Sequence, residues 1–219
     1  MDAETSLLPV QGGPVVTILI LLSVVATTFI LAKVWQFIRL GSGGQKKSEQ
    51  ALALLEKGDV AQTLIMSRNQ KSPSLSLIAH VTELRQKQMP EDVLKEESMR
   101  TARVSLVNLG KGLRPIEVIA NVAPLIGLFG TVLGMIEAFQ AMESAGSQVD
   151  PAVLSGGIWQ ALLTTAAGLA VAIPVSMIHS ALERKVEMEG ANLQNVHDRL
   201  FVIGHQKPQL KTAATGTAK

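Results

Sequence analysis

Residues 123–135 read APLIGLFGTVLGM. The stretch is apolar, yet it contains a proline, three glycines and a threonine. In a water-soluble helix each glycine would cost roughly 1 kcal/mol relative to alanine. In lipid the same glycines are favourable, because small residues let two helix backbones approach closely. The stretch therefore predicts a membrane helix with one close-packed face.

Two further apolar stretches accompany this one. Residues 15–34 carry a single charge, Lys33 at their end, and residues 156–182 carry no charge apart from one histidine near their end. Together with residues 118–136, each is about long enough to cross a hydrocarbon core of about 30 Å as a helix. The mean hydropathy of +0.29 agrees with a membrane protein. We therefore expect three membrane spans.

The charges of the chain predict how these spans are oriented. All 20 lysines and arginines lie either between Lys33 and Arg114 or after residue 182. The segment before the first span and the loop between the second and third spans carry acids only. Because lysine and arginine concentrate on the inner side of a membrane, the N-terminus is expected outside and the C-terminus inside. A start without basic residues also favours a retained first span over a signal peptide.

Helix-forming residues dominate the region between the first two spans. The break GSGGQ (41–45) is followed by Leu52 and Leu55 at helical spacing and by Gly58 as a stop. A second short helix is expected from Asp59, and another from about Ser74 to Lys87. The region is therefore predicted to be helical throughout, in short elements.

Two longer helices are expected to join this region to the spans. One starts at Pro90, exposes the charged face EDVLKEESMRTAR to solvent and continues, with a bend, to about Met142. The other continues from the third span as a solvated helix that carries His197. A polar tail, residues 207–219, is expected to be disordered.

Small and polar residues form stripes along the second and third spans. Helix packing is expected at Gly127, Gly130, Gly134 and Gly168, and helix kinks at Pro124 and Pro174. Five polar residues share or adjoin these stripes: Thr131, Gln160, Thr164, Thr165 and Ser176. The hydroxyl of a threonine can simply bond a backbone carbonyl one turn back. The five residues can equally face something polar or wet, and both interpretations remain open.

No Asp, Glu, Lys, Arg or His lies in the middle of any span. A proton-driven transporter needs a titratable group inside the membrane. If protons cross here, the carboxylate must come from another chain. The chain also lacks cysteine, a phosphate-binding loop and a ligand-like spacing of its four histidines. We therefore expect no enzyme activity, no metal, no cofactor and no nucleic-acid partner.

Two motifs resemble the signature spans of the MotA/TolQ/ExbB proton-channel family. They are VAPLIGLFGTVLGMIEAF (122–139) and IWQALLTTAAGLAVAIPVSM (158–177). Three spans with a large first loop are similar to the ExbB and TolQ branch. The resemblance covers roughly residues 95–190 and implies a pentamer in the bacterial inner membrane. It also implies that a single-span ExbD- or TolR-like partner in the central pore supplies the protonatable aspartate.

The resemblance further implies a role for individual residues. Pore-lining threonines of the family fall on Thr131 and Thr165 here, and close relatives commonly have a glutamate where this chain has Gln160. Proton flow would energise a TonB-like protein for transport across the outer membrane. Two alternatives are a TolQ-like role in envelope integrity, through a TolA-like protein, and a non-conducting membrane scaffold.

The expected fold is an all-α integral membrane protein that assembles as a homo-oligomeric ring among membrane lipids. Two of its three transmembrane helices extend into a cytoplasmic helical domain. The expected segments are a periplasmic N-terminus (1–14), transmembrane helix 1 (15–36), a cytoplasmic helical region (37–115), transmembrane helix 2 (116–139), a periplasmic loop (140–155), transmembrane helix 3 (156–182) and a cytoplasmic helix with a tail (183–219).

Overall fold

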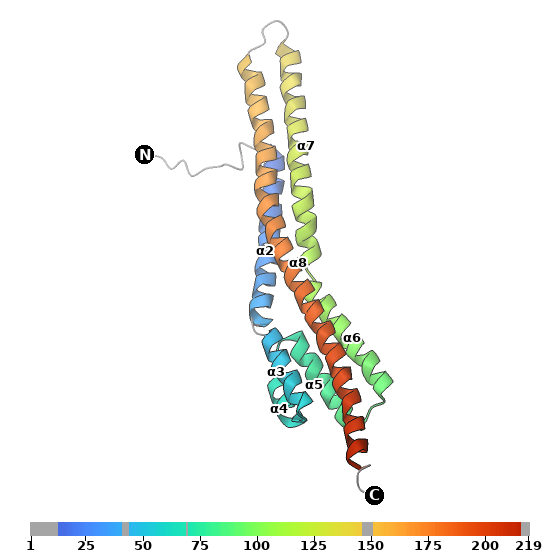
Figure 1. Ribbon diagram of the computed structural model, residues 1–219. Coiled ribbons are helices and arrows are strands. Elements are labelled where there is room, and N and C mark those ends of the chain that lie inside the picture. The colour runs from blue at the N-terminus through green and yellow to red at the C-terminus, as the bar shows by residue number, and fades with distance from the viewer. Residues whose placement is uncertain (1–12, 41–43, 69, 146–150, 216–219) are drawn as a thin grey trace, which may run out of the picture. The chain divides into compact units, whose positions relative to one another are not determined.

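The computed structural model describes residues 13–40, 44–68, 70–145 and 151–215, which form α-helices and no strand (Figure 1). Three helical stretches of these residues are long and apolar enough to cross a membrane, within Gly13–Glu56, Glu91–Ser144 and Pro151–Gly204. The expected all-helical chain with three candidate spans is confirmed. The helices are α2 (Gly13–Leu40), α3 (Gly44–Glu56), α4 (Val60–Ser67), α5 (Pro73–Gln86), α6 (Glu91–Gly110), α7 (Leu113–Ala145) and α8 (Pro151–Thr215).

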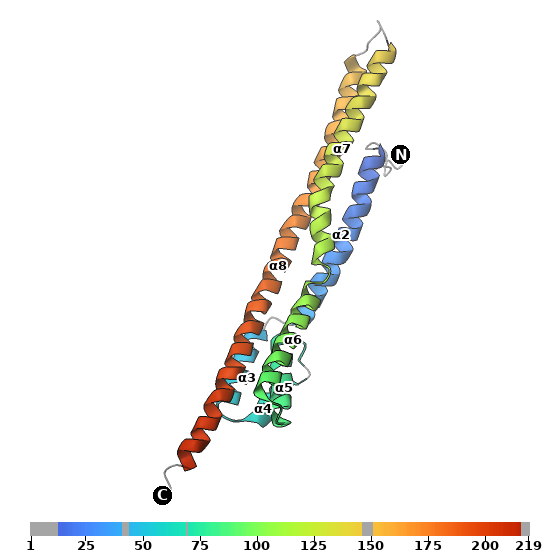
Figure 2. The ribbon, with the colours of Figure 1, turned by 90° about the vertical axis from the view of Figure 1, so that its right-hand side faces the viewer.

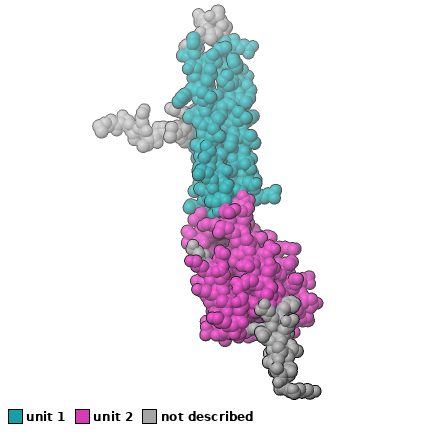
Figure 3. All heavy atoms as spheres, in the orientation of Figure 1, with its two compact units in different colours: residues 1–33, 112–182 teal, residues 34–111, 183–219 magenta. Residues whose placement is uncertain are grey.

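The chain divides into two compact units, which Figure 3 colours separately. Unit 1 comprises residues 1–33 and 112–182, and unit 2 comprises residues 34–111 and 183–219. Each unit draws on segments that are distant in the sequence. The helix α8 contributes residues to both.

In unit 1, α7 and the first part of α8 lie side by side in both views of the ribbon (Figures 1 and 2). The helix α2 packs against them through Val15 and Leu19, which form a buried cluster with Ala123 and Ala172. Much of the remaining surface of α2 is apolar and exposed; Leu31, for example, is 63% exposed. Such a surface suits contact with lipid, where apolar exposure carries no penalty.

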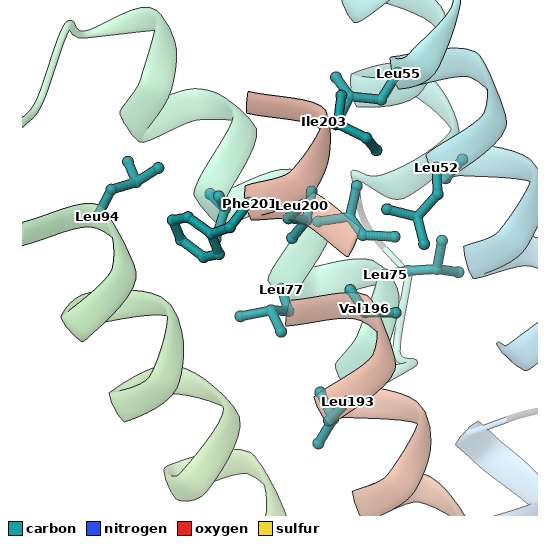
Figure 4. Close-up of a cluster of buried hydrophobic side chains, with 13 residues drawn as sticks. Leu52, Leu55, Leu75, Leu77, Leu94, Leu193, Val196, Leu200, Phe201 and Ile203 are labelled. Carbon is teal, nitrogen blue, oxygen red and sulfur yellow. The ribbon is translucent and has the colours of Figure 1, made fainter. Parts of the chain in front are cut away.

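In unit 2, the second part of α8 is the centre of a hydrophobic core (Figure 4). Leu193, Val196 and Leu200 of α8 are almost completely buried. The other helices surround them with Leu52 and Leu55 from α3, Leu75, Leu77, Ile78 and Val81 from α5, and Leu94 from α6. This core corrects the expectation of a solvated helix, because His197 is only 7% exposed and its ring packs on Phe201 of the core.

The short helices begin and end close to where the sequence predicts. Gly58 ends the turn after α3 with φ of +88°, a conformation that favours glycine. Asp59 then caps α4, because its carboxylate accepts a hydrogen bond of 3.0 Å from the backbone N–H of Gln62. Of the predicted break at 41–45, residues 41–43 lie outside the described part of the chain.

The longer helices differ from expectation in three places. The expected bent helix from Pro90 is divided into α6 and α7 at Lys111 and Gly112, where Gly112 adopts φ of +85°. The helix α8 extends to Thr215, beyond the start of the expected disordered tail, since a formed helix adds residues at little cost. Helix also occupies both ends of the expected loop 140–155. Residues 1–12, 146–150 and 216–219 lie outside the described residues.

Candidate functional site

The contact between α7 and α8 in unit 1 has no side chains at its centre. A Cβ atom added to Gly168 would lie 2.7 Å from the carbonyl oxygen of Ala123 and 3.1 Å from the Cα of Gly127. A Cβ added to Gly127 would lie 2.8 Å from the carbonyl oxygen of Thr164. Distances below 3.0 Å are essentially never seen for real Cβ atoms. The two glycines therefore let the helix backbones touch.

The other predicted glycines extend this contact along α7. At Gly134, an added Cβ would lie 3.1 Å from the Cβ of Ala161. At Gly130 it would meet both the Thr164 hydroxyl at 2.6 Å and a methyl group of Val15 at 2.8 Å. Gly130 thus lies where α2, α7 and α8 meet.

One packing glycine was missed by the sequence reasoning. An added Cβ at Gly157 would lie 2.5 Å from the Cβ of Ala138. Its spacing could have identified it, because Gly157 precedes Ala161 by four residues and so continues the stripe of small residues on α8.

Two threonine hydroxyls of α8 converge on one carbonyl of α7. The hydroxyl of Thr164 lies 3.1 Å from the carbonyl oxygen of Gly127 and 2.7 Å from that of Ala161. The hydroxyl of Thr165 donates to the same Gly127 oxygen at 3.3 Å. Thr164 is buried, at 3% exposure, whereas Thr165 is only partly buried. The structure thus places Thr164 inside the helix contact and Thr165 at its edge.

Thr131 lies one helical turn after Gly127 on α7. Its hydroxyl donates to the carbonyl oxygen of Leu128 at 2.6 Å, and its side chain is partly exposed. This bond stays within one helix and holds nothing together between helices. The hydroxyl can therefore turn to another acceptor without breaking the α7–α8 contact.

A groove of about 620 Å³ follows the α7–α8 seam; neither Thr131 nor Thr165 lines it, but several lining residues share a helix face with one of them. Pro124 and Ala120 line it on α7, seven and eleven residues before Thr131. On α8 it is lined by Leu169 and Ser176, four and eleven residues after Thr165. These offsets correspond to one, two and three helical turns, so Thr131 shares a face of α7 with the first two residues and Thr165 shares a face of α8 with the other two. Ser176 is exposed there.

The remaining predicted residues are placed as follows. Gln160 is exposed, and its amide nitrogen lies 3.6 Å from the position of a Cβ on Gly13, at the start of α2. Pro124 and Pro174 both lie within helices that continue past them. Among the described residues, no three His, Cys, Asp or Glu side chains come close enough to hold a metal ion.

The chemistry of this face is limited to hydroxyl groups. Residues 118–136 and 156–178 contain no side chain that titrates in the physiological range. A hydroxyl can donate one hydrogen bond and accept others, but it does not store a proton. The face can therefore orient a carboxylate or a chain of waters and cannot by itself provide the protonatable group.

Comparisons with known proteins agree with these features. The family described as the MotA/TolQ/ExbB proton channel family matches residues 68–195. The biopolymer transport protein ExbB of Salmonella typhimurium is 29% identical over 204 residues, which cover 90% of this chain and 83% of that protein. The Tol-Pal system protein TolQ of Haemophilus influenzae is 38% identical over 89 residues, covering 41% of this chain and 39% of that protein.

An archaeal relative extends well beyond the matched region. The putative biopolymer transport protein ExbB homolog of Methanothermobacter thermautotrophicus is 32% identical over 137 residues. These residues cover 62% of this chain and 47% of the relative, so the match spans about half of that protein's length.

Proposed function

Because the chain belongs to the MotA/TolQ/ExbB proton channel family, in its ExbB/TolQ branch, we propose that it is the channel subunit of a proton-driven motor in the bacterial inner membrane. The motor uses the proton motive force to energise TonB-dependent transport across the outer membrane. The N-terminus faces the periplasm and the C-terminus the cytoplasm, in agreement with the distribution of lysine and arginine.

The observation that carries this proposal is the hydroxyl-lined face of α7 and α8. Thr131 and Thr165 lie on that face in a part of the chain without any titratable side chain. Proton transfer inside a membrane needs such a group. We therefore assign the proton-carrying carboxylate to an aspartate of an ExbD- or TolR-like single-span partner.

The two hydroxyls then have a defined role toward that aspartate. When the carboxylate is charged, the Thr131 and Thr165 hydroxyls donate hydrogen bonds to it, and such charge-assisted bonds are strong. When the carboxylate is protonated, the hydroxyls return to the carbonyl oxygens of Leu128 and Gly127. Ser176 extends this face three turns further along α8, whereas Thr164 serves the helix contact. Gln160 adds an exposed amide beside the start of α2.

The exposed apolar surfaces of unit 1 support an assembly of several copies around the partner. Phe129, Leu125 and Leu162 are each more than half exposed in a single chain. In the proposed pentameric ring, such side chains contact lipid or the neighbouring copy. The α7–α8 face with its threonines lines the central pore.

Proton flux through purified protein tests the proposal. Proteoliposomes containing this chain with an ExbD-like partner should acidify when a membrane potential drives protons inward, whereas this chain alone should not. The control is the same complex with the partner's membrane aspartate replaced by asparagine. Robust flux without the partner would contradict the assignment of the carboxylate, and no flux with it would favour a non-conducting scaffold.

The similarity to TolQ supports a second candidate function, in envelope integrity through a TolA-like protein. Both functions use the same channel and differ in the protein that is energised. Complementation separates them: the chain with its own partner should restore TonB-dependent uptake to a strain lacking that channel. Rescue of detergent sensitivity in a strain lacking TolQ, without rescue of uptake, would favour the second candidate.

A further inference from the structure

A buried histidine joins two helices of unit 2. His197 of α8 is 7% exposed, and its Nδ1 atom lies 2.9 Å from the hydroxyl oxygen of Ser98 on α6, which is fully buried. The imidazole ring also packs on Phe201, with a distance of 4.9 Å between ring centroids. A titratable group thus lies within the contact between α6 and α8.

Both helices contribute charges near this pair. Lys95 and Arg103 of α6 and Asp198 of α8 line a groove of about 490 Å³ beside His197. From α5, His80 approaches the carboxylate of Glu97, the neighbour of Ser98, at 3.5 Å. The groove gives water and protons access to one side of an otherwise buried ring.

The surroundings favour the neutral form of His197. Burial is the main cause and lowers the pKa of this imidazole below 6.5; Asp198 acts in the opposite direction, and Lys95 lowers the pKa further. A neutral ring that carries its proton on Nε2 accepts a hydrogen bond from Ser98 at Nδ1. At neutral pH the contact is therefore satisfied.

We propose that His197 and Ser98 form an acid-sensitive latch that holds α6 against α8 at neutral pH and releases it as the surrounding solution acidifies. Protonation places a hydrogen on Nδ1, so the Ser98 hydroxyl must change from donor to acceptor and its own proton loses the ring as a partner. Protonation also places a positive charge in a buried contact close to Lys95. This buried charge favours a state in which the ring turns toward the water-accessible groove and the helices separate.

Linkage gives the direction and size of the response. The folded chain binds this proton less readily than the unfolded chain, whose histidine has a pKa near 6.5. The latch contributes its full stability above pH 6.5 and loses it as the pH falls from there to the pKa of the folded form. Within this window the ratio of open to closed latch rises up to about tenfold per pH unit.

In the proposed channel this latch would sense the proton load on the inner side of the membrane. The helix α8 carries both Thr165 and His197. Protons delivered to the cytoplasm would loosen the helical packing of unit 2, which would provide a means of limiting further flow. This regulatory consequence rests on the proposed function, whereas the latch itself does not.

Distance measurements on the full chain test the latch directly. The chain has no cysteine, so spin labels can be attached to the double variant Glu96→Cys and Asn195→Cys, whose positions are exposed on α6 and α8. In nanodiscs, the distribution of label distances should lengthen or broaden reversibly between pH 7.5 and 5.5. An unchanged distribution over this range would overturn the proposal.

Two substitutions identify the group responsible. His197→Gln retains an acceptor for Ser98 and does not titrate, so the response should disappear. The matched control His80→Gln removes the other histidine that contacts α6 and should leave the response intact. A response that persists in His197→Gln, or vanishes in His80→Gln, contradicts the latch.

If His197→Gln fails to fold, the proposal can still be tested on the wild-type chain. The chemical shifts of its labelled histidines report ring protonation, and a His197 that titrates at or above pH 6.5 would overturn the proposal. None of these measurements needs proton flux, so a failed latch and a failed channel function are distinguishable.

Discussion

Gly127 and Gly168 bring the backbones of α7 and α8 into direct contact, since a Cβ on Gly168 would lie 3.1 Å from the Cα of Gly127. The same site carries the carbonyl oxygen that receives the Thr165 hydroxyl. The packing of the two helices and the position of a candidate pore hydroxyl are thus set by one pair of glycines.

Replacing Gly168 by alanine should therefore force the helices apart. The added Cβ would lie 2.7 Å from the backbone carbonyl oxygen of Ala123, which cannot move as a flexible side chain could. Overpacking of this kind costs about 1–3 kcal/mol. We expect a lower thermal midpoint of the purified protein. The matched control is Gly156→Ala on the same helix, where no heavy atom lies within 4 Å of the added Cβ, and it should unfold no earlier than wild type.

Removing the hydroxyl of Thr131 or Thr165 should impair proton-driven uptake and leave assembly with the partner largely intact. Valine keeps the shape but loses a hydrogen bond to a charged group, which is worth about 1.5–3 kcal/mol. Each variant should thus lower the rate of uptake roughly ten- to hundredfold. The measurement is energised transport in cells, with co-purification of the partner as the test of assembly.

Thr28→Val is the control for these variants. The Thr28 hydroxyl also bonds a carbonyl of its own helix, that of Val24 at 2.8 Å, but it is exposed on α2. It should support normal uptake. Full uptake activity of both Thr131→Val and Thr165→Val would contradict a pore role for these hydroxyls. An equal loss of uptake in these two variants and in Thr28→Val would indicate a general effect of the substitution on membrane helices.

Gln160 should act through its polarity and not through titration. Gln160→Glu is expected to change proton-driven uptake by no more than about twofold, because the polar contact is retained. Gln160→Leu should reduce uptake further while the protein still assembles. If the glutamate variant instead gains activity with a new dependence on pH, then a titratable group at this position contributes to proton passage.

A buried polar network in unit 2 should contribute to stability. Ser74 of α5 is fully buried; its hydroxyl donates to a carboxylate oxygen of Glu189 at 2.8 Å and accepts from the Asn192 amide at 2.8 Å. Ser74→Ala leaves Asn192 without its acceptor, at a cost of about 1–3 kcal/mol. Thermal unfolding should show the loss. Ser76→Ala, at an exposed position of the same helix, should show none.

The three spans and the glycine contact could be predicted because both depend on patterns within short segments of the sequence. Hydrophobic length identifies a span, and small residues three or four positions apart identify a close-packed stripe. The burial of Thr164 could not be predicted. Neighbouring residues of a helix point in different directions, and the position of the partner helix determines which of them it buries. Thr164 is buried, whereas Thr165 is only partly buried.

The buried His197 was missed for a related reason. Its helix carries enough charged residues to suggest a solvated element, and Ser98 belongs to the equally charged α6. The sequence does contain a pattern that indicates a buried face: Leu193, Val196 and Leu200 are three or four residues apart on α8. Which of the short helices would cover that stripe depends on tertiary packing, which the periodicity of one segment does not reveal.

The glycines and alanines between α7 and α8 also affect the entropy of this part of the protein. These residues have no rotamers, so the contact forms without loss of side-chain freedom and offers no side chains that could rearrange around a passing charge. The O–H bonds of Thr131 and Thr165 are different, because each can rotate about its Cβ–Oγ bond while the backbone stays in place. The proposed proton path would then run beside a rigid helix contact, while the hydroxyl groups on this subunit's side reorient quickly.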